Sequence, residues 1–184
     1  EPSRRRVDTS GDTIKLDLAD CFVDAIEIAR ASEDGLSTLP PGRLRSLSTL
    51  FSGEFLDGLE LDRNPGFNAW LTAQRRRFRG CHAVLLERLA ATATGDEVFE
   101  HLEKWLELAP FDVRVHEALL NAFARRGRIR EGEEHLATAG RLFEGEGLDC
   151  APIRDRWRAA RACAVAPVPS PSPAADRDGA AAAA

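Results

Sequence analysis

The chain has 184 residues, of which 43% are apolar and 30% charged, a balance typical of one globular domain with additional tails. Tyrosine is absent and aromatic residues make up 7%, while Ala, Leu, Arg and Glu dominate, so the composition favours helices over β-sheet. The formal net charge of −5 argues against a domain that binds a polyanion over its whole surface, because nucleic-acid affinity depends on basic side chains that displace counterions.

The N-terminal segment, residues 1–12, is polar and rich in turn-forming residues. Residues 13–18 then alternate polar and apolar side chains, which is the period of a β-strand. A single strand is not stable alone, so we expect it to pair with a partner outside this chain or to lie along the helices. Residues 1–18 are therefore predicted to form an extension to the main domain.

Two short helices are predicted before the longest one. The first covers about residues 22–31, with Phe22, Ile26 and Ala29 on one apolar stripe. The second covers about residues 43–51 and follows a breaker of two prolines and a glycine.

A long amphipathic helix is predicted after Asn64 and Pro65, because Asn caps free backbone amides and Pro is preset for the first helical position. Gly95 ends this helix. Its stripe recurs every three or four residues and comprises Phe67, Leu71, Gln74, Phe78, Cys81, Leu85 and Leu89.

Four more helices follow, which makes an all-α fold of about seven helices with one short N-terminal strand. Each of them has an apolar stripe and a local start or stop signal. They are a helix with Val98, Leu102, Trp105, Leu106 and Ala109 that stops at Pro110, one that Asp112 caps and Gly127 ends, one with Leu136, Ala139, Leu142 and Phe143 that Gly145 and Gly147 close, and a last one with Ile153, Trp157 and Ala160.

Two helical hairpins repeat at a separation of 34 residues, the period of tetratricopeptide-like units. Each hairpin leaves an apolar face uncovered, so neighbours stack to hide it, and the helix around Trp157 is expected to cap the stack. Position 132 is Gly, where tetratricopeptide-like units usually have Ala. The alternative to a stack of repeated hairpins is a helical bundle without repeats. The aligned pairs are Val98 with Gly132, Leu102 with Leu136, Trp105 with Ala139, Leu86 with Leu120, and Leu89 with Phe123.

Residues 164–184 alternate Pro, Ala and Ser and end in a run of Ala, which is typical of a semi-extended linker. This leaves residues 19–163 as the helical domain. The chain starts without Met and contains none, so we expect it to be a piece of a longer protein. The four cysteines form no CxxC pair, which favours reduced, structural thiols over a zinc site, with disulfides as the alternative.

No reaction is indicated by the sequence, and the chain is predicted not to be an enzyme and to hold no cofactor or metal. The four histidines lie on different predicted helices, without an HExxH or HxxxH pair, and are interpreted as surface residues. Neither a phosphate-binding Gly-rich loop after a strand nor a GxSxG motif occurs. The histidines are His82, His101, His116 and His135.

Two arginine clusters are the candidate binding residues for a protein partner or for phosphate. Arg75, Arg76 and Arg79 lie on the outer face of the long helix. Arg125, Arg126 and Arg128 lie at a helix end, where cations also suit the helix dipole. The alternative for both clusters is an ordinary solvated face.

Several stretches, in order, resemble the bacterial transcriptional activator domain of SARP-type (antibiotic regulatory protein) regulators, over about residues 12–162. They are Asp12-Thr-Ile-Lys-Leu-Asp17, Phe51-Ser-Gly-Glu-Phe-Leu-Asp-Gly-Leu59, Phe67-Asn-Ala-Trp-Leu-Thr-Ala-Gln-Arg-Arg-Arg-Phe78, Leu106-Glu-Leu-Ala-Pro-Phe-Asp112 and the ending from Gly147 to Trp157.

This resemblance implies a TPR-like domain that follows a winged-helix DNA-binding domain and supports dimerisation or contacts with transcription machinery. The strand at residues 13–18 then becomes the seam to a winged-helix domain outside this chain. We therefore expect a non-catalytic, cytoplasmic interaction module that contacts DNA only through that other domain and does not contact a membrane. Two alternatives remain: an accessory domain of a multidomain signalling enzyme of the adenylate-cyclase type, and direct DNA contact through the arginine clusters.

Overall fold

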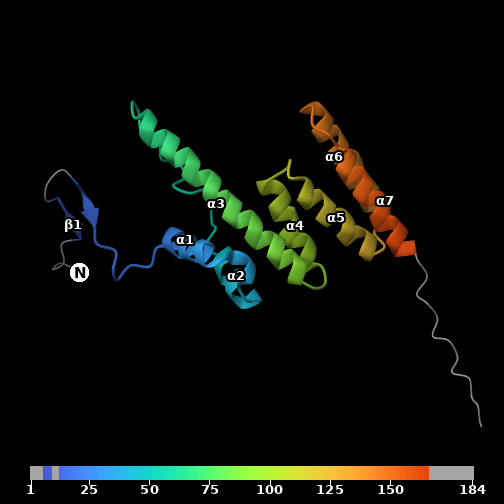
Figure 1. The fold of residues 1–184 in the computed structure, drawn as a ribbon, viewed down its shortest axis with the longest axis horizontal. Coiled ribbons are helices and arrows are strands. Elements are labelled where there is room, and N and C mark those ends of the chain that lie inside the picture. Colours follow the sequence, from blue (N-terminus) through green and yellow to red (C-terminus); the bar gives the residue numbers. More distant parts are fainter. Residues whose placement is uncertain (1–5, 10–12, 166–184) are drawn as a thin grey trace, which may run out of the picture. The chain divides into compact units, whose positions relative to one another are not determined.

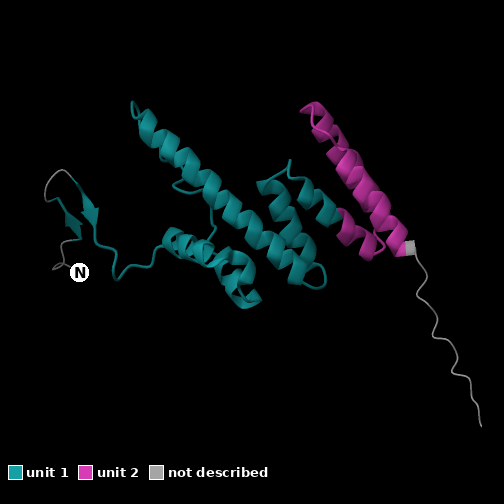
Figure 2. Ribbon diagram, in the orientation of Figure 1, with its two compact units in different colours: residues 1–119 teal, residues 120–184 magenta. Residues whose placement is uncertain are grey.

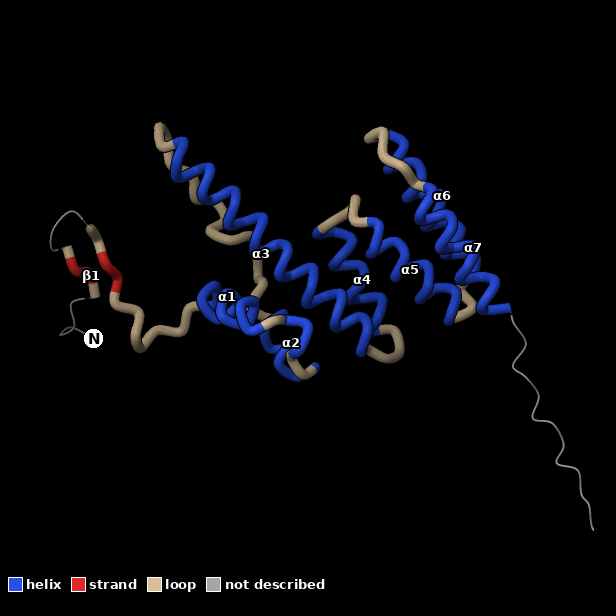
Figure 3. The backbone as a smooth tube through the Cα atoms, viewed as in Figure 1, coloured by secondary structure: helices blue, strands red, loops and turns tan. Residues whose placement is uncertain are grey.

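The structure, a computed structural model, describes residues 6–9 and 13–165 (Figure 1). The described residues form seven α-helices and one two-stranded sheet, which confirms the predicted all-α fold with a short N-terminal strand (Figure 3). The chain divides into two compact units, residues 1–119 and 120–184, and the boundary falls within a helix (Figure 2). The elements are β1 (Val7–Asp8), β2 (Lys15–Leu16), α1 (Asp24–Asp34), the 3-10 helix η1 (Leu36–Thr38), α2 (Pro41–Ser48), α3 (Pro65–Thr92), α4 (Glu97–Leu108), α5 (Val113–Arg125), α6 (Ile129–Gly145) and α7 (Ala151–Val165).

The predicted strand finds its partner within the chain. β1 and β2 pair antiparallel, with Val7 opposite Leu16 and Asp8 opposite Lys15. The expectation that the strand pairs outside the chain or lies along the helices was therefore wrong. A ladder needs only backbone amides and carbonyls, so the polar segment around Asp8 serves as a partner without an alternating pattern of its own. Residues 1–5 and 10–12 of this extension lie outside the described residues.

The first unit builds its core where α1, η1 and α2 pack against the C-terminal half of α3. α1 begins at Asp24, so Phe22 precedes the helix and is 72% exposed, against the prediction that Phe22 heads the buried stripe. The buried residues of α1 are Ile28 and Ala31. The core cluster comprises Ile28, Ala31, Leu36, Leu44, Leu47, Phe78, Cys81, Leu85 and Leu89.

Local signals place the ends of α3 as the sequence predicts. The Asn64 side chain accepts a hydrogen bond from the Phe67 amide at 3.0 Å, and Pro65 is the first residue of the helix. After Thr92 the chain turns at Gly95, whose φ of 63° favours glycine, and α4 packs against α3 (Figure 1). Asp112 accepts from the Arg114 amide at 3.0 Å at the start of α5, the capping contact that the sequence predicts there.

The second unit contains the end of α5 together with α6 and α7. α6 and α7 pack against each other and bury Ala139, Phe143, Cys150, Ile153 and Trp157. α7 continues to Val165, so the first residues of the predicted linker are helical. The rest of that linker, residues 166–184, lies outside the described residues.

Candidate functional site

A hollow on the surface of the first unit gathers one of the two predicted arginine clusters. It has a volume of about 390 Å³ and is lined by Glu54, Thr72, Arg75, Arg76 and Arg79. The last four lie on α3 at spacings of three and four residues, which places them on one face of the helix. We call this site the α3 hollow.

Arg75 forms the inner wall of the α3 hollow and is only 20% exposed. Its Nε donates to the Phe55 carbonyl at 3.0 Å, and its Nη2 donates to the Leu56 carbonyl at 2.8 Å. Both carbonyls belong to the irregular segment 51–64 that precedes α3. Arg75 therefore fixes this segment against the helix, a role that the sequence did not reveal.

Glu54 places a carboxylate between two of the guanidinium groups. Its Oε1 pairs with Arg79 Nη2, and its Oε2 lies 3.5 Å from Arg75 Nε. Arg76 is exposed and has no hydrogen-bond or ion-pair partner among the described residues. Because three guanidinium groups and one carboxylate line the hollow, it retains an excess of positive charge.

Aromatic contacts pack the irregular segment 51–64, which Arg75 joins to the α3 hollow through the Phe55 carbonyl. The Phe55 ring stacks on Phe78 with centroids 4.7 Å apart and meets the edge of Trp70 at 6.2 Å. Leu56 adopts a left-handed φ of 50°; its carbonyl accepts from Arg75, and its side chain remains exposed. Leu59 is exposed as well, and its carbonyl lies 3.5 Å from Arg75 Nη2, so both leucines belong to the segment that contacts the arginine.

Sequence reasoning found the three arginines but missed Glu54 and Thr72. Glu54 pairs across 21 and 25 positions with Arg75 and Arg79, in a segment without regular structure. No local periodicity reports such a pairing. Thr72 could have been found, because it stands one helical turn before the arginines.

The second arginine cluster lies in the second unit, at the end of α5 and in the turn that follows it. Arg128 Nε donates to Glu131 Oε1 at 2.7 Å, and its guanidinium lies 5.2 Å from the centre of the Phe123 ring. Arg125 and Arg126 are exposed on either side of the helix end. The charge of Arg128 is thus balanced locally, and the two predicted clusters belong to different units.

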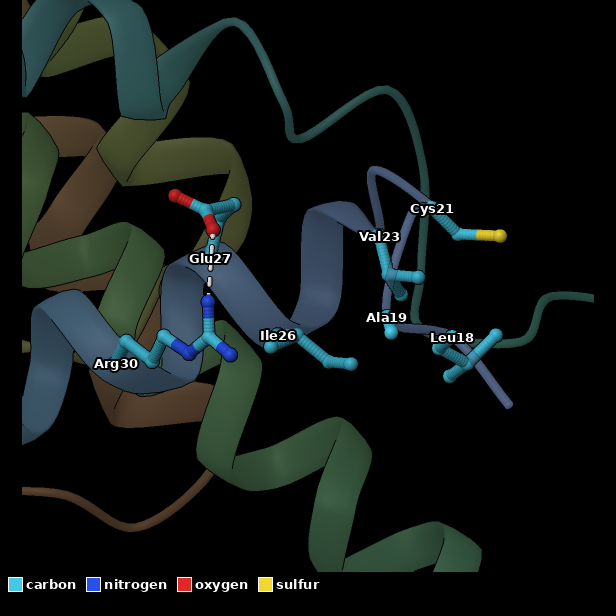
Figure 4. Close-up of a pocket in the computed structure, with 7 residues that line it drawn as sticks. All are labelled: Leu18, Ala19, Cys21, Val23, Ile26, Glu27 and Arg30. Atoms are coloured by element: carbon cyan, nitrogen blue, oxygen red, sulfur yellow. Dashed lines mark hydrogen bonds and ion pairs between the residues drawn. The ribbon is translucent and has the colours of Figure 1, made fainter. Parts of the chain in front are cut away.

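A second hollow, of about 290 Å³, lies where the segment before α1 meets that helix (Figure 4). Its charged members are already paired, since Glu27 lies 3.4 Å from Arg30 and 3.2 Å from Arg43. The Cys21 side chain points away from Glu27 and Arg30 in Figure 4. The lining residues are Leu18, Ala19, Cys21, Val23, Ile26, Glu27 and Arg30.

The four histidines lie on four different helices, as predicted, but not all lie on the surface. His116 is 1% exposed, and its Nε2 lies 2.8 Å from the Pro110 carbonyl. His82 stacks on Phe51 with centroids 4.2 Å apart. Burial lowers the pKa of both imidazoles, and the charge of Lys104 lowers the pKa of His82 further.

Within residues 6–9 and 13–165, no group of three or more His, Cys, Asp or Glu side chains is placed to hold a metal ion. None of the helices described combines the length and the apolar character needed to cross a bilayer. The chain matches no protein-family model, no curated protein and no solved structure.

Proposed function

We propose that the chain is a non-catalytic protein-interaction and dimerisation module built from TPR-like hairpins, part of a cytoplasmic SARP-like transcriptional regulator. In this proposal it relays a signal to a winged-helix DNA-binding domain that is outside the chain. Its partners are a second copy of itself or a protein of the transcription machinery.

The 34-residue register is the observation that supports the hairpin repeat best. Leu86 on α3 and its equivalent Leu120 on α5 are both fully buried, and so are Trp105 on α4 and its equivalent Ala139 on α6. A glycine with positive φ follows α3 and another follows α5, at Gly95 and Gly127. These two pairs have equivalent burial, as expected of repeated units, whereas Leu102 and Leu89 are buried and their equivalents Leu136 and Phe123 are only partly buried.

The N-terminal hairpin supports a docking role for this end of the chain. Val7 and Leu16 are cross-strand neighbours and share a face of the sheet, and Ile14 lies two residues before Leu16 on the same face. All three side chains are exposed, Ile14 by 79%. Phe22, which follows them in the chain, is also exposed. An apolar face of this kind is typical of a surface that another domain covers.

Sedimentation velocity over a wide range of chain concentrations tests self-association, and affinity capture from the host tests for a protein partner. We expect a concentration-dependent dimer or a specific partner, with either contact large enough to exceed ~1,000 Å² of buried surface. A chain that stays monomeric throughout and captures no protein contradicts the proposal.

Direct contact with DNA is the second candidate, supported by the excess positive charge of the α3 hollow. It predicts duplex binding that weakens steeply with salt, since each neutralised phosphate releases counterions. Undetectable binding at low salt removes this candidate.

A further inference from the structure

The α3 hollow already binds one carboxylate, that of the chain's own Glu54. The carboxylate lies between Arg75 and Arg79, each of which offers a planar fork of N–H donors. Guanidinium forks match the planar geometry of carboxylates and form short, charge-assisted hydrogen bonds with them. The site is therefore preformed for this chemical group.

Glu54 leaves most of the donors in the hollow unused. A guanidinium carries five N–H donors, and Arg79 meets Glu54 through one terminal nitrogen while 52% of its side chain remains exposed. Arg76 has no partner among the described residues and lines the same hollow. The free donors of Arg76 and Arg79 are thus available to a second anion.

The surroundings favour an isolated carboxylate with apolar neighbours over a polyanion. The segment beside the hollow alternates exposed acidic residues, Asp57 and Glu60, with the exposed Leu56 and Leu59. A phosphate backbone that follows this surface meets repulsion from the acidic residues and from the chain's net charge of −5. A short peptide places one acidic group in the hollow and its apolar side chains against the leucines.

We infer that the α3 hollow is a docking site for an acidic side chain of a partner protein, presented next to apolar side chains. The biological partner rests on the proposed interaction function, but binding at the hollow is a property of this chain and is measured separately. Nucleic acid is the alternative ligand, and the experiment has to distinguish its binding from that of an acidic peptide.

The test is the fluorescence anisotropy of a labelled peptide, acetyl-Leu-Glu-Leu-Leu-amide, titrated with the full chain. We expect saturable binding that is lost when the peptide's Glu is replaced by Gln. Arg76→Glu weakens binding by about tenfold or more, because it replaces a charge-assisted donor with a repelling charge. Glu54→Gln tightens binding, because it frees Arg79 while Arg75 keeps its bonds to the Phe55 and Leu56 carbonyls.

Arg88→Glu is the matched control, since Arg88 is exposed on the same helix but lies outside the hollow. It makes the same charge change and should leave peptide affinity unchanged. Equal losses for Arg76→Glu and Arg88→Glu, or no saturable binding to the native chain, overturn the inference. A preference for a short DNA duplex over the peptide overturns it in favour of nucleic acid.

The outcomes also separate the inference from the proposed function. If the chain dimerises or captures a partner but does not bind the peptide, only the inference that the α3 hollow docks an acidic side chain is refuted. Peptide binding by a chain that neither dimerises nor captures a partner refutes the proposed function alone.

Discussion

The ring of Trp157 on α7 occupies the place where a side chain at Gly132 on α6 would lie. A Cβ atom built on Gly132 would be 2.2 Å from Cη2 of Trp157, far inside van der Waals contact. Trp157 is 2% exposed, so its ring has no open space into which it can shift. The departure from alanine at position 132 therefore has a steric cause: only glycine lets the indole lie against the backbone of α6.

Gly132→Ala should destabilise the second unit by about 1–3 kcal/mol, because the added methyl group overpacks a filled contact. Urea unfolding monitored by tryptophan fluorescence and by circular dichroism measures the change. Gly145→Ala is the control, since Gly145 lies on the same helix and a Cβ there meets nothing within 4 Å. It should be neutral or slightly stabilising. If the two variants unfold alike, the Trp157 contact does not fix position 132.

The helices were predictable because their limits are set locally. Asn64 caps the first turn of α3, Asp112 caps α5, and Gly95 and Gly127 supply positive φ after two of the helices. Each signal acts within a few residues, so it can be read without knowing what packs against the helix. The same holds for the arginines of the α3 hollow, which share one helix face.

The remaining features depend on contacts between distant segments. β1 pairs with β2 through backbone groups, which leave no side-chain pattern in the sequence. Phe22 looks like the first member of an apolar stripe until the helix begins at Asp24 and leaves it exposed. Glu54 joins the hollow because Arg75 holds segment 51–64 on α3. The strand pairing, the exposure of Phe22 and the position of Glu54 all depend on long-range packing. Composition and periodicity do not predict such packing.

Asn64→Ala should destabilise the first unit by about 1 kcal/mol, because the Phe67 amide loses the side-chain oxygen that accepts its hydrogen bond. Equilibrium unfolding in urea measures the loss. Asn64→Asp keeps an acceptor oxygen at the start of the helix, where a negative charge also suits the dipole, and should retain the stability. Equal losses in the two variants contradict a capping role.

The chain should lose stability as the pH falls below about 6.5, the ordinary imidazole pKa. Burial lowers the pKa of His116 and His82 in the folded chain, so below this pH the unfolded chain binds more protons than the folded chain. This contribution to the free energy of unfolding is complete above pH 6.5 and declines as the pH falls towards the folded pKa values. Urea unfolding between about pH 5 and pH 8 measures the slope.

Lys104→Gln separates the two histidines. The charge of Lys104 lowers the pKa of His82 and is not among the groups that act on His116, for which the Pro110 carbonyl and Asp112 oppose the effect of burial. The substitution should raise the pKa of His82 and leave that of His116 unchanged in NMR titrations of the imidazole protons. Equal shifts at both rings show a general charge effect instead.

Arg75→Ala should release segment 51–64 from α3, because the Phe55 and Leu56 carbonyls lose their charged donor. We expect a loss of about 2 kcal/mol in the free energy of unfolding and faster proteolysis within this segment. Arg75→Lys should rescue little, since an ammonium group cannot reproduce a fork that reaches two carbonyls at once. Arg76→Ala, one position along the helix, removes an exposed guanidinium without such bonds and should protect the segment as well as the native chain does. Rapid cleavage in Arg76→Ala as well means that general charge on α3, and not the Arg75 fork, holds the segment.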